Sequence, residues 1–203
     1  MGLPKDSGLE LYAKWPSGPK NLITDVPGVR VGQVTLKDEE HDIHTGVTAI
    51  IPHEGDIFHD KLMVGVSVIN GFGKSTGLVQ IEELGSLETP IILTNTLNVG
   101  TAYEALTEYM LEKNGDIGRE TGTVNCVITE CNDGRVNDIR GMHVKKEHVR
   151  KALSEASETF SEGCAGAGTG MVCLGLKGGI GSASKQLTID GDSYTIGALV
   201  MSN

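Results

Sequence analysis

The feature that most constrains the fold of this chain is a glycine-rich run between Gly163 and Gly181. The run reads Gly-Cys-Ala-Gly-Ala-Gly-Thr-Gly-Met-Val-Cys-Leu-Gly-Leu-Lys-Gly-Gly-Ile-Gly. Glycine is needed where the backbone takes a positive φ or comes close to another group, because it has no Cβ. Glycines inside a strand mark bulges and bends, but this density exceeds what a bent strand requires. We therefore interpret the run as part of a functional site.

The spacing of the glycines argues against two phosphate-binding motifs. In a Gly-x-Gly-x-x-Gly dinucleotide fingerprint the third glycine would stand at position 171, which is Met171. The segment Gly71-Phe72-Gly73-Lys74-Ser75-Thr76 resembles the end of a phosphate-binding loop, but Val68 stands where that motif begins with glycine. We interpret this segment as the entry of a helix, with the Lys74 side chain in solvent.

Charge and length narrow the possible functions. The 203 residues carry a formal net charge of −10, which repels phosphate backbones and anionic lipid surfaces. We therefore expect no nucleic-acid or membrane partner, and a substrate that bears an amine fits better. The amino terminus lacks the apolar core of a signal peptide, and no apolar stretch is long enough to span a membrane. A cytoplasmic location is expected.

The cysteines and histidines are not spaced as in known metal sites. The cysteines are too few and too irregularly spaced for a disulfide framework, so we expect buried free thiols. The histidines lack a His-Glu-x-x-His pattern and are expected to be solvated. The sequence thus predicts neither a metal nor a cofactor. The residues concerned are Cys126, Cys131, Cys164, Cys173, His41, His44, His53 and His59.

Short and nearly continuous apolar runs predict central strands that are covered on both faces. They comprise residues 46–51, 63–69 and 91–94, and residues 124–130 predict another strand. Residues 171–187 predict a long strand bent at its glycines. The dipeptide Asp190-Gly191 is a strong β-hairpin signal and joins this strand to one over residues 194–202.

Three helices are predicted between the strands. The first covers residues 75–84 and ends at Gly85, the second has an apolar stripe from Ala102 to Met110 and ends at Asn114, and the third covers residues 144–158. The fold class is therefore α/β with a substantial antiparallel part. We expect residues 1–20 to form an N-terminal arm and residues 21–203 to form a single α/β domain.

Glu130 is a candidate site residue because it ends a strongly apolar strand, Val-Asn-Cys-Val-Ile-Thr-Glu. A carboxylate at the carboxyl end of a core strand is often functional. The alternative is a structural ion pair with a nearby arginine, Arg135 or Arg140. The sequence alone does not favour either role.

Eight segments, taken in order, resemble one family, the L-aminopeptidase/D-esterase and β-peptidyl aminopeptidase family. The resemblance covers nearly the whole chain after residue 20, and its most specific block runs from Gly168-Thr-Gly-Met171 to Leu176-Lys-Gly-Gly-Ile-Gly181. The other segments are Asn21-Leu-Ile-Thr-Asp-Val-Pro-Gly-Val-Arg-Val-Gly32, Thr45-Gly-Val-Thr48, Val68-Ile-Asn-Gly71, Leu97-Asn-Val-Gly100, Arg135-Val-Asn-Asp-Ile139 and Tyr194-Thr-Ile-Gly197.

The resemblance implies an N-terminal-nucleophile hydrolase with an αββα sandwich. In that family one precursor cleaves itself into an α chain and a β chain, and the new amino-terminal Ser of the β chain attacks the substrate. This chain resembles most of an α chain, so its domain would be completed by a separate β chain from the same precursor. No Ser or Thr among the 203 residues inherits the role of nucleophile. The family also implies an oligomer of several αβ units.

Two residues of this chain match functional residues of the family. Asn203 matches the asparagine whose side-chain amide donates to the oxyanion, an interaction worth about 3 kcal/mol in comparable sites. Glu130 matches the carboxylate that holds the free amino group of the substrate. Some members place a tyrosine where this chain has Asn132, so a phenol is not expected here. The glycine run would let the backbone pass close to a bound peptide.

The resemblance favours hydrolysis of amino-terminal residues from short peptides, amino acid amides or esters. One alternative is an acyltransferase like the ornithine acetyltransferases, which share the self-cleaving architecture. Another is a non-enzymatic glycine-rich binding domain that is complete at Asn203.

Overall fold

The computed structural model describes residues 15–203, so most of the predicted arm, residues 1–14, lies outside the described part. The elements follow the order expected of an α/β chain. They are β1 (Arg30–Asp38), β2 (Ile43–Ile51), β3 (Leu62–Met63), α1 (Leu78–Leu84), β4 (Ser86–Leu87), β5 (Ile91–Asn95), α2 (Val99–Lys113), β6 (Val127–Cys131), α3 (Lys146–Ser154), β7 (Val172–Cys173), β8 (Leu176–Lys177), β9 (Gly179–Ile189) and β10 (Asp192–Ser202), with 3-10 helices at Ile23–Asp25, Thr96–Asn98, Ile139–Gly141 and Gly166–Gly168.

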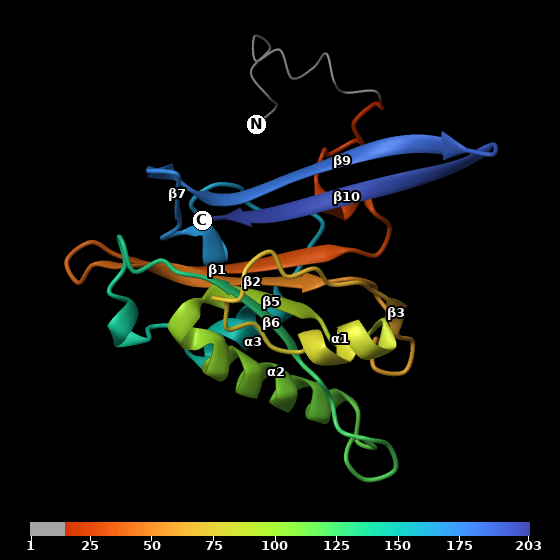
Figure 1. The fold of residues 1–203 in the computed structure, drawn as a ribbon, viewed down its shortest axis with the longest axis horizontal. Coiled ribbons are helices and arrows are strands. Elements are labelled where there is room, and N and C mark those ends of the chain that lie inside the picture. Colours follow the sequence, from red (N-terminus) through yellow and green to blue (C-terminus); the bar gives the residue numbers. More distant parts are fainter. Residues whose placement is uncertain (1–14) are drawn as a thin grey trace.

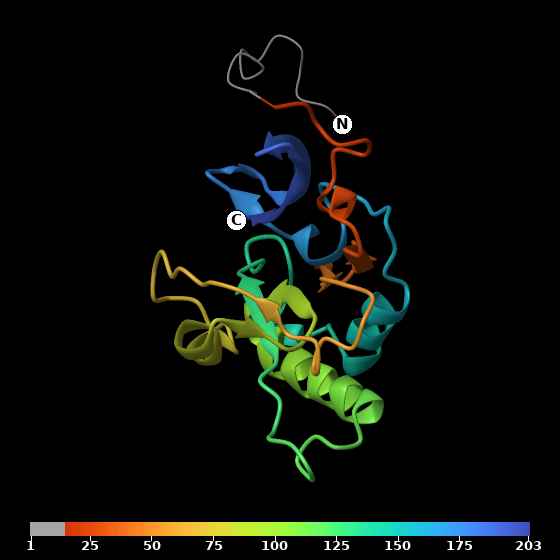
Figure 2. The same cartoon turned by 90° about the vertical axis from the view of Figure 1, so that its right-hand side faces the viewer.

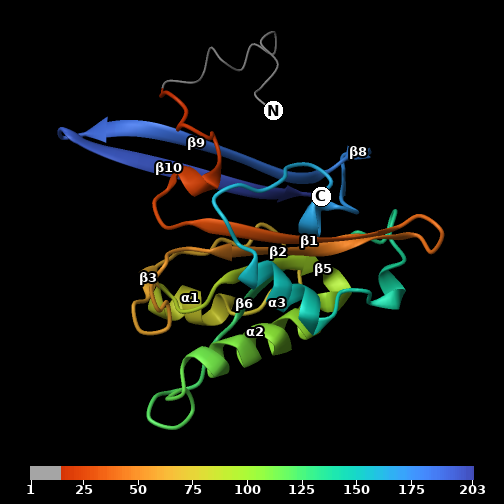
Figure 3. The same ribbon diagram turned by 180° about the vertical axis from the view of Figure 1, so that it is seen from behind.

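Three layers build the described part of the chain (Figure 1). A central sheet has the strand order β1-β2-β5-β6. Helices α2 and α3 cover one face of this sheet, and the β9–β10 hairpin covers the other face (Figure 3). The side view in Figure 2 shows the hairpin above the sheet and α2 below it. The predicted α/β class therefore takes the form of one helix layer and two β layers.

The register of the central sheet determines which strand ends meet. Strands β1, β2 and β5 pair antiparallel, whereas β5 and β6 pair parallel, with Thr94 opposite Glu130 and Asn95 opposite Cys131. Helix α2 lies between β5 and β6 in the chain, as a parallel pair requires a crossover connection. The carboxyl ends of β5 and β6 therefore lie at the same edge of the sheet.

Apolar side chains fill both spaces between the layers. The larger cluster lies between the sheet and the helices and includes Ile92, Leu106 and Ile128, all fully buried. Each such side chain contributes about 1.5–3 kcal/mol when it leaves water. A smaller cluster contains Leu93 and Ile180 and joins the sheet to the hairpin. The predicted apolar stripe of α2 is buried as expected.

The hairpin at Asp190-Gly191 is confirmed. Asp190 has φ 53° and Gly191 has φ 94°, and Asp192 pairs with Ile189. Two consecutive positive φ angles are typical of a type I′ turn, whose twist matches that of the flanking strands. The turn joins two strands of 11 residues each.

Two strand predictions are wrong in extent. Of residues 63–69 only Met63 belongs to a strand, and Ile69 is 98% exposed, because β4, the partner of β3, is only two residues long. The strand predicted over residues 171–187 is interrupted, since Leu174 and Gly175 have positive φ angles and form a tight turn between β7 and β8. The long strand β9 begins only at Gly179.

Two helices are shorter than predicted. Helix α1 begins at Leu78 after Gly77, which has φ 79°, and ends at Gly85 in the left-handed conformation as predicted. Its Val79 side chain is 78% exposed, so only Ile81 of the predicted apolar side is buried. Helix α3 ends at Ser154. Within residues 15–203 no helix combines the length and apolar character needed to cross a bilayer.

Candidate functional site

Glu130 lies at the carboxyl end of β6 and its carboxylate accepts two hydrogen bonds from neutral groups. The Lys74 backbone N–H donates to Oε1 at 3.0 Å, and the Thr96 hydroxyl donates to Oε2. Within residues 15–203 neither Arg135 nor Arg140 forms an ion pair with it, so the structural alternative from the sequence is not found. The Lys74 ammonium instead contacts the Phe72 carbonyl and ring. The half-buried carboxylate is thus oriented but carries no neutralising side chain.

Asn203 follows the last residue of β10 and contacts the segment after β6. Its Nδ2 donates to the Asn132 carbonyl oxygen at 2.9 Å. The same Nδ2 has two longer contacts, 3.4 Å to the Val172 carbonyl oxygen and 3.5 Å to the Met171 Sδ. The Asn132 carbonyl oxygen is the nearest of these three acceptors, and an amide nitrogen carries two N–H donors.

The structure thus brings the two predicted site residues to the same edge of the central sheet. Asn203 bonds the carbonyl of Asn132, which stands two positions after Glu130. A second contact supports this placement, since the Cys131 thiol lies 3.8 Å from the Met201 carbonyl oxygen. A carboxylate that can bind a cation and an amide that can donate to an anion therefore come from two different layers.

A buried polar network next to this edge was not identified from the sequence. Asn137 Nδ2 donates to Asp133 Oδ1 at 3.0 Å, and Asn137 Oδ1 accepts from the His44 N–H at 2.9 Å. Asn95 Nδ2 donates to the Thr45 hydroxyl oxygen at 2.8 Å. The network ties the loop after β6 to the start of β2 and the end of β5. The sequence feature that could have indicated this network is the polar pair Asn132-Asp133, directly after the buried strand β6.

Asp133 is the most unusual member of that network. It is fully buried, and its Oδ2 has no hydrogen-bond partner. Burial raises the pKa of Asp133 above the usual value, while hydrogen bonds from Thr45 and Asn137 oppose the shift. A carboxyl group in such a place favours its neutral form.

The glycine run packs against the sheet rather than forming one bent strand. Its 3-10 helix Gly166–Gly168 lies between the sheet and the hairpin. A Cβ on Gly170 would stand 2.1 Å from the His44 carbonyl oxygen, and one on Gly168 would stand 2.5 Å from the Ile180 nitrogen. These distances are too short for any side chain, so close backbone approach explains these two glycines. Contact of the run with a bound peptide stays a prediction.

The thiols near the site are poor nucleophiles. Burial raises the pKa of Cys131 to about 11, and the neighbouring Glu130 charge adds to the shift. Burial likewise raises the pKa of Cys126 to about 11. Thiolates are therefore scarce here near neutral pH. All four cysteines are free as predicted, although only Cys126 is buried.

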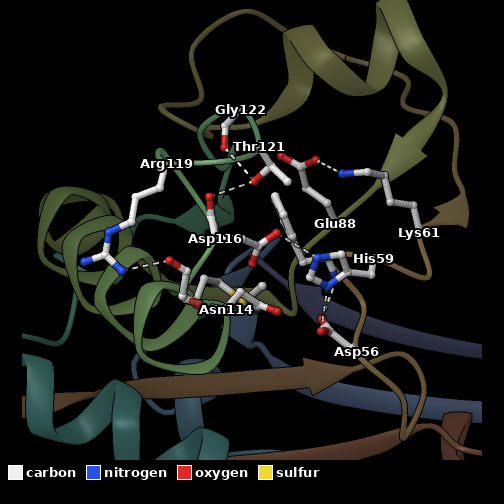
Figure 4. Close-up of polar contacts among 12 residues, drawn as sticks. Asp56, His59, Lys61, Glu88, Asn114, Asp116, Arg119, Thr121 and Gly122 are labelled. Atoms are coloured by element: carbon white, nitrogen blue, oxygen red, sulfur yellow. Dashed lines mark hydrogen bonds and ion pairs between the residues drawn. The ribbon is translucent and has the colours of Figure 1, made fainter.

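Several histidines are held by other groups rather than simply solvated as predicted, and His59 is the clearest case. His59 lies between two carboxylates, with Nδ1 2.8 Å from Asp56 Oδ2 and Nε2 2.9 Å from Asp116 Oδ2 (Figure 4). The Asp56 and Asp116 carboxylates raise the pKa of His59. This cluster follows β2 and lies at the opposite edge of the sheet from Glu130. Within residues 15–203 no group of three or more acidic, histidine or cysteine side chains could hold a metal ion.

Comparisons with known proteins identify the family of this chain. Peptidase family S58 matches residues 21–203. The β-peptidyl aminopeptidase BapA of Sphingosinicella microcystinivorans is 38% identical over 207 residues, which cover 98% of this chain and 50% of that protein. The chain thus spans about half the length of the curated relatives it matches.

Two solved structures resemble the whole described fold. The PH0078 protein of Pyrococcus horikoshii OT3 has a TM-score of 0.91 at 53% identity, covering 97% of this chain and 58% of its own. The L-aminopeptidase D-Ala-esterase/amidase of Ochrobactrum anthropi has a TM-score of 0.83 at 36% identity, covering 94% and 55%. That enzyme is described as a prototype for the serine aminopeptidases and a variant of the Ntn hydrolase fold. The resemblance inferred from the sequence is therefore confirmed, and the chain belongs to peptidase family S58.

Proposed function

We propose that this chain is the α-chain part of an aminopeptidase that removes amino-terminal residues from short peptides, amino acid amides or esters. The observation that carries the proposal is the meeting of Glu130 and Asn203 at one edge of the sheet, in a chain of peptidase family S58. The β-peptidyl aminopeptidase relative supports the same substrate class. The family match favours hydrolysis over acyl transfer between amino acids.

In this proposal Glu130 binds the ammonium group of the substrate. Its carboxylate is oriented by Lys74 N–H and the Thr96 hydroxyl and is not neutralised by a side chain. A hydrogen bond between two charged groups contributes about 1.5–3 kcal/mol. A free amino terminus would therefore be selected over a blocked one.

Asn203 would stabilise the charge that develops on the carbonyl oxygen. A Ser hydroxyl attacks the carbonyl carbon, the oxygen takes the electron pair, and the amide hydrogen of Asn203 that Asn132 does not hold donates to it. Collapse of this intermediate expels the amine or alcohol, and water then hydrolyses the acyl-enzyme. The Ser would be the first residue of a β chain cut from the same precursor, and its free α-amine would act as the base.

The same proposal extends to the assembly. The β chain would complete an αββα sandwich by adding to the hairpin layer and covering its outer face, where Tyr194, Ile196 and Val200 are exposed. Several αβ units would form an oligomer. A cytoplasmic location stays a prediction of the sequence.

Variants of the two site residues test the proposal. In the protein expressed from its gene, we expect Glu130→Gln to raise KM for amino acid anilides about 10–100-fold, since a charge-assisted bond is lost. We expect Asn203→Ala to lower kcat about 10²–10³-fold. Glu82→Gln, on the exposed face of α1, is the matched control. Unchanged kinetics in both site variants would contradict the proposal.

Two further readouts separate the alternatives. Intact-mass measurement should find a second chain that begins with Ser or Thr, and a single uncleaved polypeptide would count against self-cleavage. Release of the free anilide amine without any acceptor amino acid would disfavour the acyltransferase alternative.

A further inference from the structure

The Lys177 side chain makes an unusual set of contacts within the glycine run. Its ammonium donates to three backbone carbonyl oxygens, 3.1 Å from that of Gly168, 2.9 Å from that of Met171 and 2.8 Å from that of Gly178. An ammonium has three N–H donors, so all of them are used by the backbone. Within residues 15–203 no carboxylate pairs with this lysine.

The three carbonyls belong to two segments that the ammonium holds together. Gly168 and Met171 lie at the end of the buried glycine turn, and Gly178 lies directly before β9. The Gly178 N–H also donates to the Met171 carbonyl oxygen at 2.9 Å. Lys177 therefore joins the two ends of the loop that contains β7 and β8. We call these joined ends the loop closure.

The loop closure contacts the Asn203 amide. The Met171 Sδ and the Val172 carbonyl lie 3.5 and 3.4 Å from Asn203 Nδ2. A Cβ on Gly178 would stand 2.2 Å from the Ser202 carbonyl oxygen, so the loop closure also packs against the backbone directly before Asn203. The same Nδ2 also donates to the Asn132 carbonyl oxygen at 2.9 Å.

We propose that Lys177 is a positioning residue for the reaction, because its ammonium holds the Met171 and Gly178 backbone against which the Asn203 amide is oriented. The inference rests on the proposed function, and Lys177 itself touches neither substrate nor nucleophile in it. Glycine-rich backbone has no side chains to restrict it, so the ammonium supplies the missing restraint. A misplacement of about 1 Å at a catalytic group can lower the rate about 10²-fold.

A double-mutant cycle tests the inference in the protein expressed from its gene. We expect Lys177→Met to lower kcat for amino acid anilides about 10–100-fold while KM changes less than about twofold, since Glu130 is not affected. In an Asn203→Ala background the same substitution should have almost no further effect on kcat. Lys185→Met is the matched control, because Lys185 lies nearby in the chain on β9 and, within residues 15–203, its ammonium donates only to the Ser17 hydroxyl.

Each outcome decides between the two proposals. If Asn203→Ala lowers kcat but Lys177→Met does not, or if the two losses multiply, the positioning role is wrong and the proposed function stands. If Asn203→Ala leaves kcat unchanged, the roles assigned to Asn203 and to Lys177 are both wrong. A merely structural lysine would lower kcat equally in both backgrounds.

A conservative variant keeps the test valid if Lys177→Met does not fold. Lys177→Arg keeps the charge and the N–H donors but places them in a planar fork. We expect it to retain a kcat between those of the wild type and Lys177→Met, and the cycle is then run with this variant. A kcat loss that persists undiminished in the Asn203→Ala background would overturn the inference here as well.

Discussion

At the scale of single residues, two carboxylates three positions apart at the end of β6 illustrate how environment sets chemistry. Glu130 is half-buried, is oriented by two neutral donors and has no ion-pair partner within residues 15–203. Asp133, three positions later, is fully buried with one oxygen unpaired. The environment of Glu130 suits the binding of an ammonium group, whereas the environment of Asp133 favours a neutral carboxyl group that fixes the loop after β6. The strand pattern indicated Glu130, but nothing local distinguished Asp133.

The raised pKa of Asp133 gives a stability prediction. Between the unfolded value of 3.8 and the higher folded value the native state binds more protons, so stability falls as pH rises through that window. We expect Asp133→Asn to remove this loss, because it keeps the oxygen that accepts from Asn137 and cannot ionise. Denaturant unfolding at a series of pH values should show a flatter profile and equal or higher stability at neutral pH.

The matched control is Asp192→Asn, on the exposed start of β10. It should leave the pH profile unchanged. A clear loss of stability at neutral pH in Asp133→Asn would show that the buried group is ionised and needed as a charge.

At the scale of elements, the glycine run acts through packing between layers. The turn around Gly166–Gly168 lies between the sheet and the hairpin, where only backbone fits. The sequence indicated close approach but not its partner, because the run contacts β2, more than a hundred positions earlier in the chain. The turn at Leu174 and Gly175 that splits the predicted strand takes no part in this packing, since Leu174 is 99% exposed and a Cβ on Gly175 would meet nothing within 4 Å.

Two alanine substitutions in the run should therefore differ sharply. Gly170→Ala would place a Cβ 2.1 Å from the His44 carbonyl oxygen, and the shift that relieves it should cost about 1–3 kcal/mol or more. Gly181→Ala meets nothing within 4 Å and should change stability by less than about 0.5 kcal/mol. Chemical denaturation of both variants measures the difference, and equal stabilities would refute the packing role.

At the scale of the whole molecule, the hairpin layer has an open apolar face. The helix layer and the sheet enclose the main core, but Tyr194, Ile196 and Val200 of β10 remain about half exposed. Exposed strands of this kind are templates for association. The excess negative charge of the chain opposes association but does not cover the face.

We expect residues 1–203 expressed alone to self-associate, since no residue in the described part of the chain covers the exposed side of the hairpin. Sedimentation velocity over a range of concentrations measures this, and Ile196→Lys on the open face should reduce it. A soluble monomer at all concentrations would instead support the non-enzymatic binding domain.

The sequence by itself determined the features that depend on neighbouring residues. The Asp190-Gly191 hairpin, the apolar stripe of α2 and the position of Glu130 at a strand end follow from turn chemistry and periodicity, which are local. The family resemblance rests on short motifs, so it can also be recognised from the sequence alone. The resemblance also indicated Asn203 as a site residue.

Only the tertiary structure decided which distant groups meet. In the folded chain Asn203 contacts Asn132 and Asp133 is buried. Lys177 joins the two ends of the β7–β8 loop, and residues 64–69 have no strand partner. Each of these depends on contacts between segments far apart in the chain. Local propensity cannot specify such contacts, because their free energy comes from burial and hydrogen bonds that exist only when the layers are assembled.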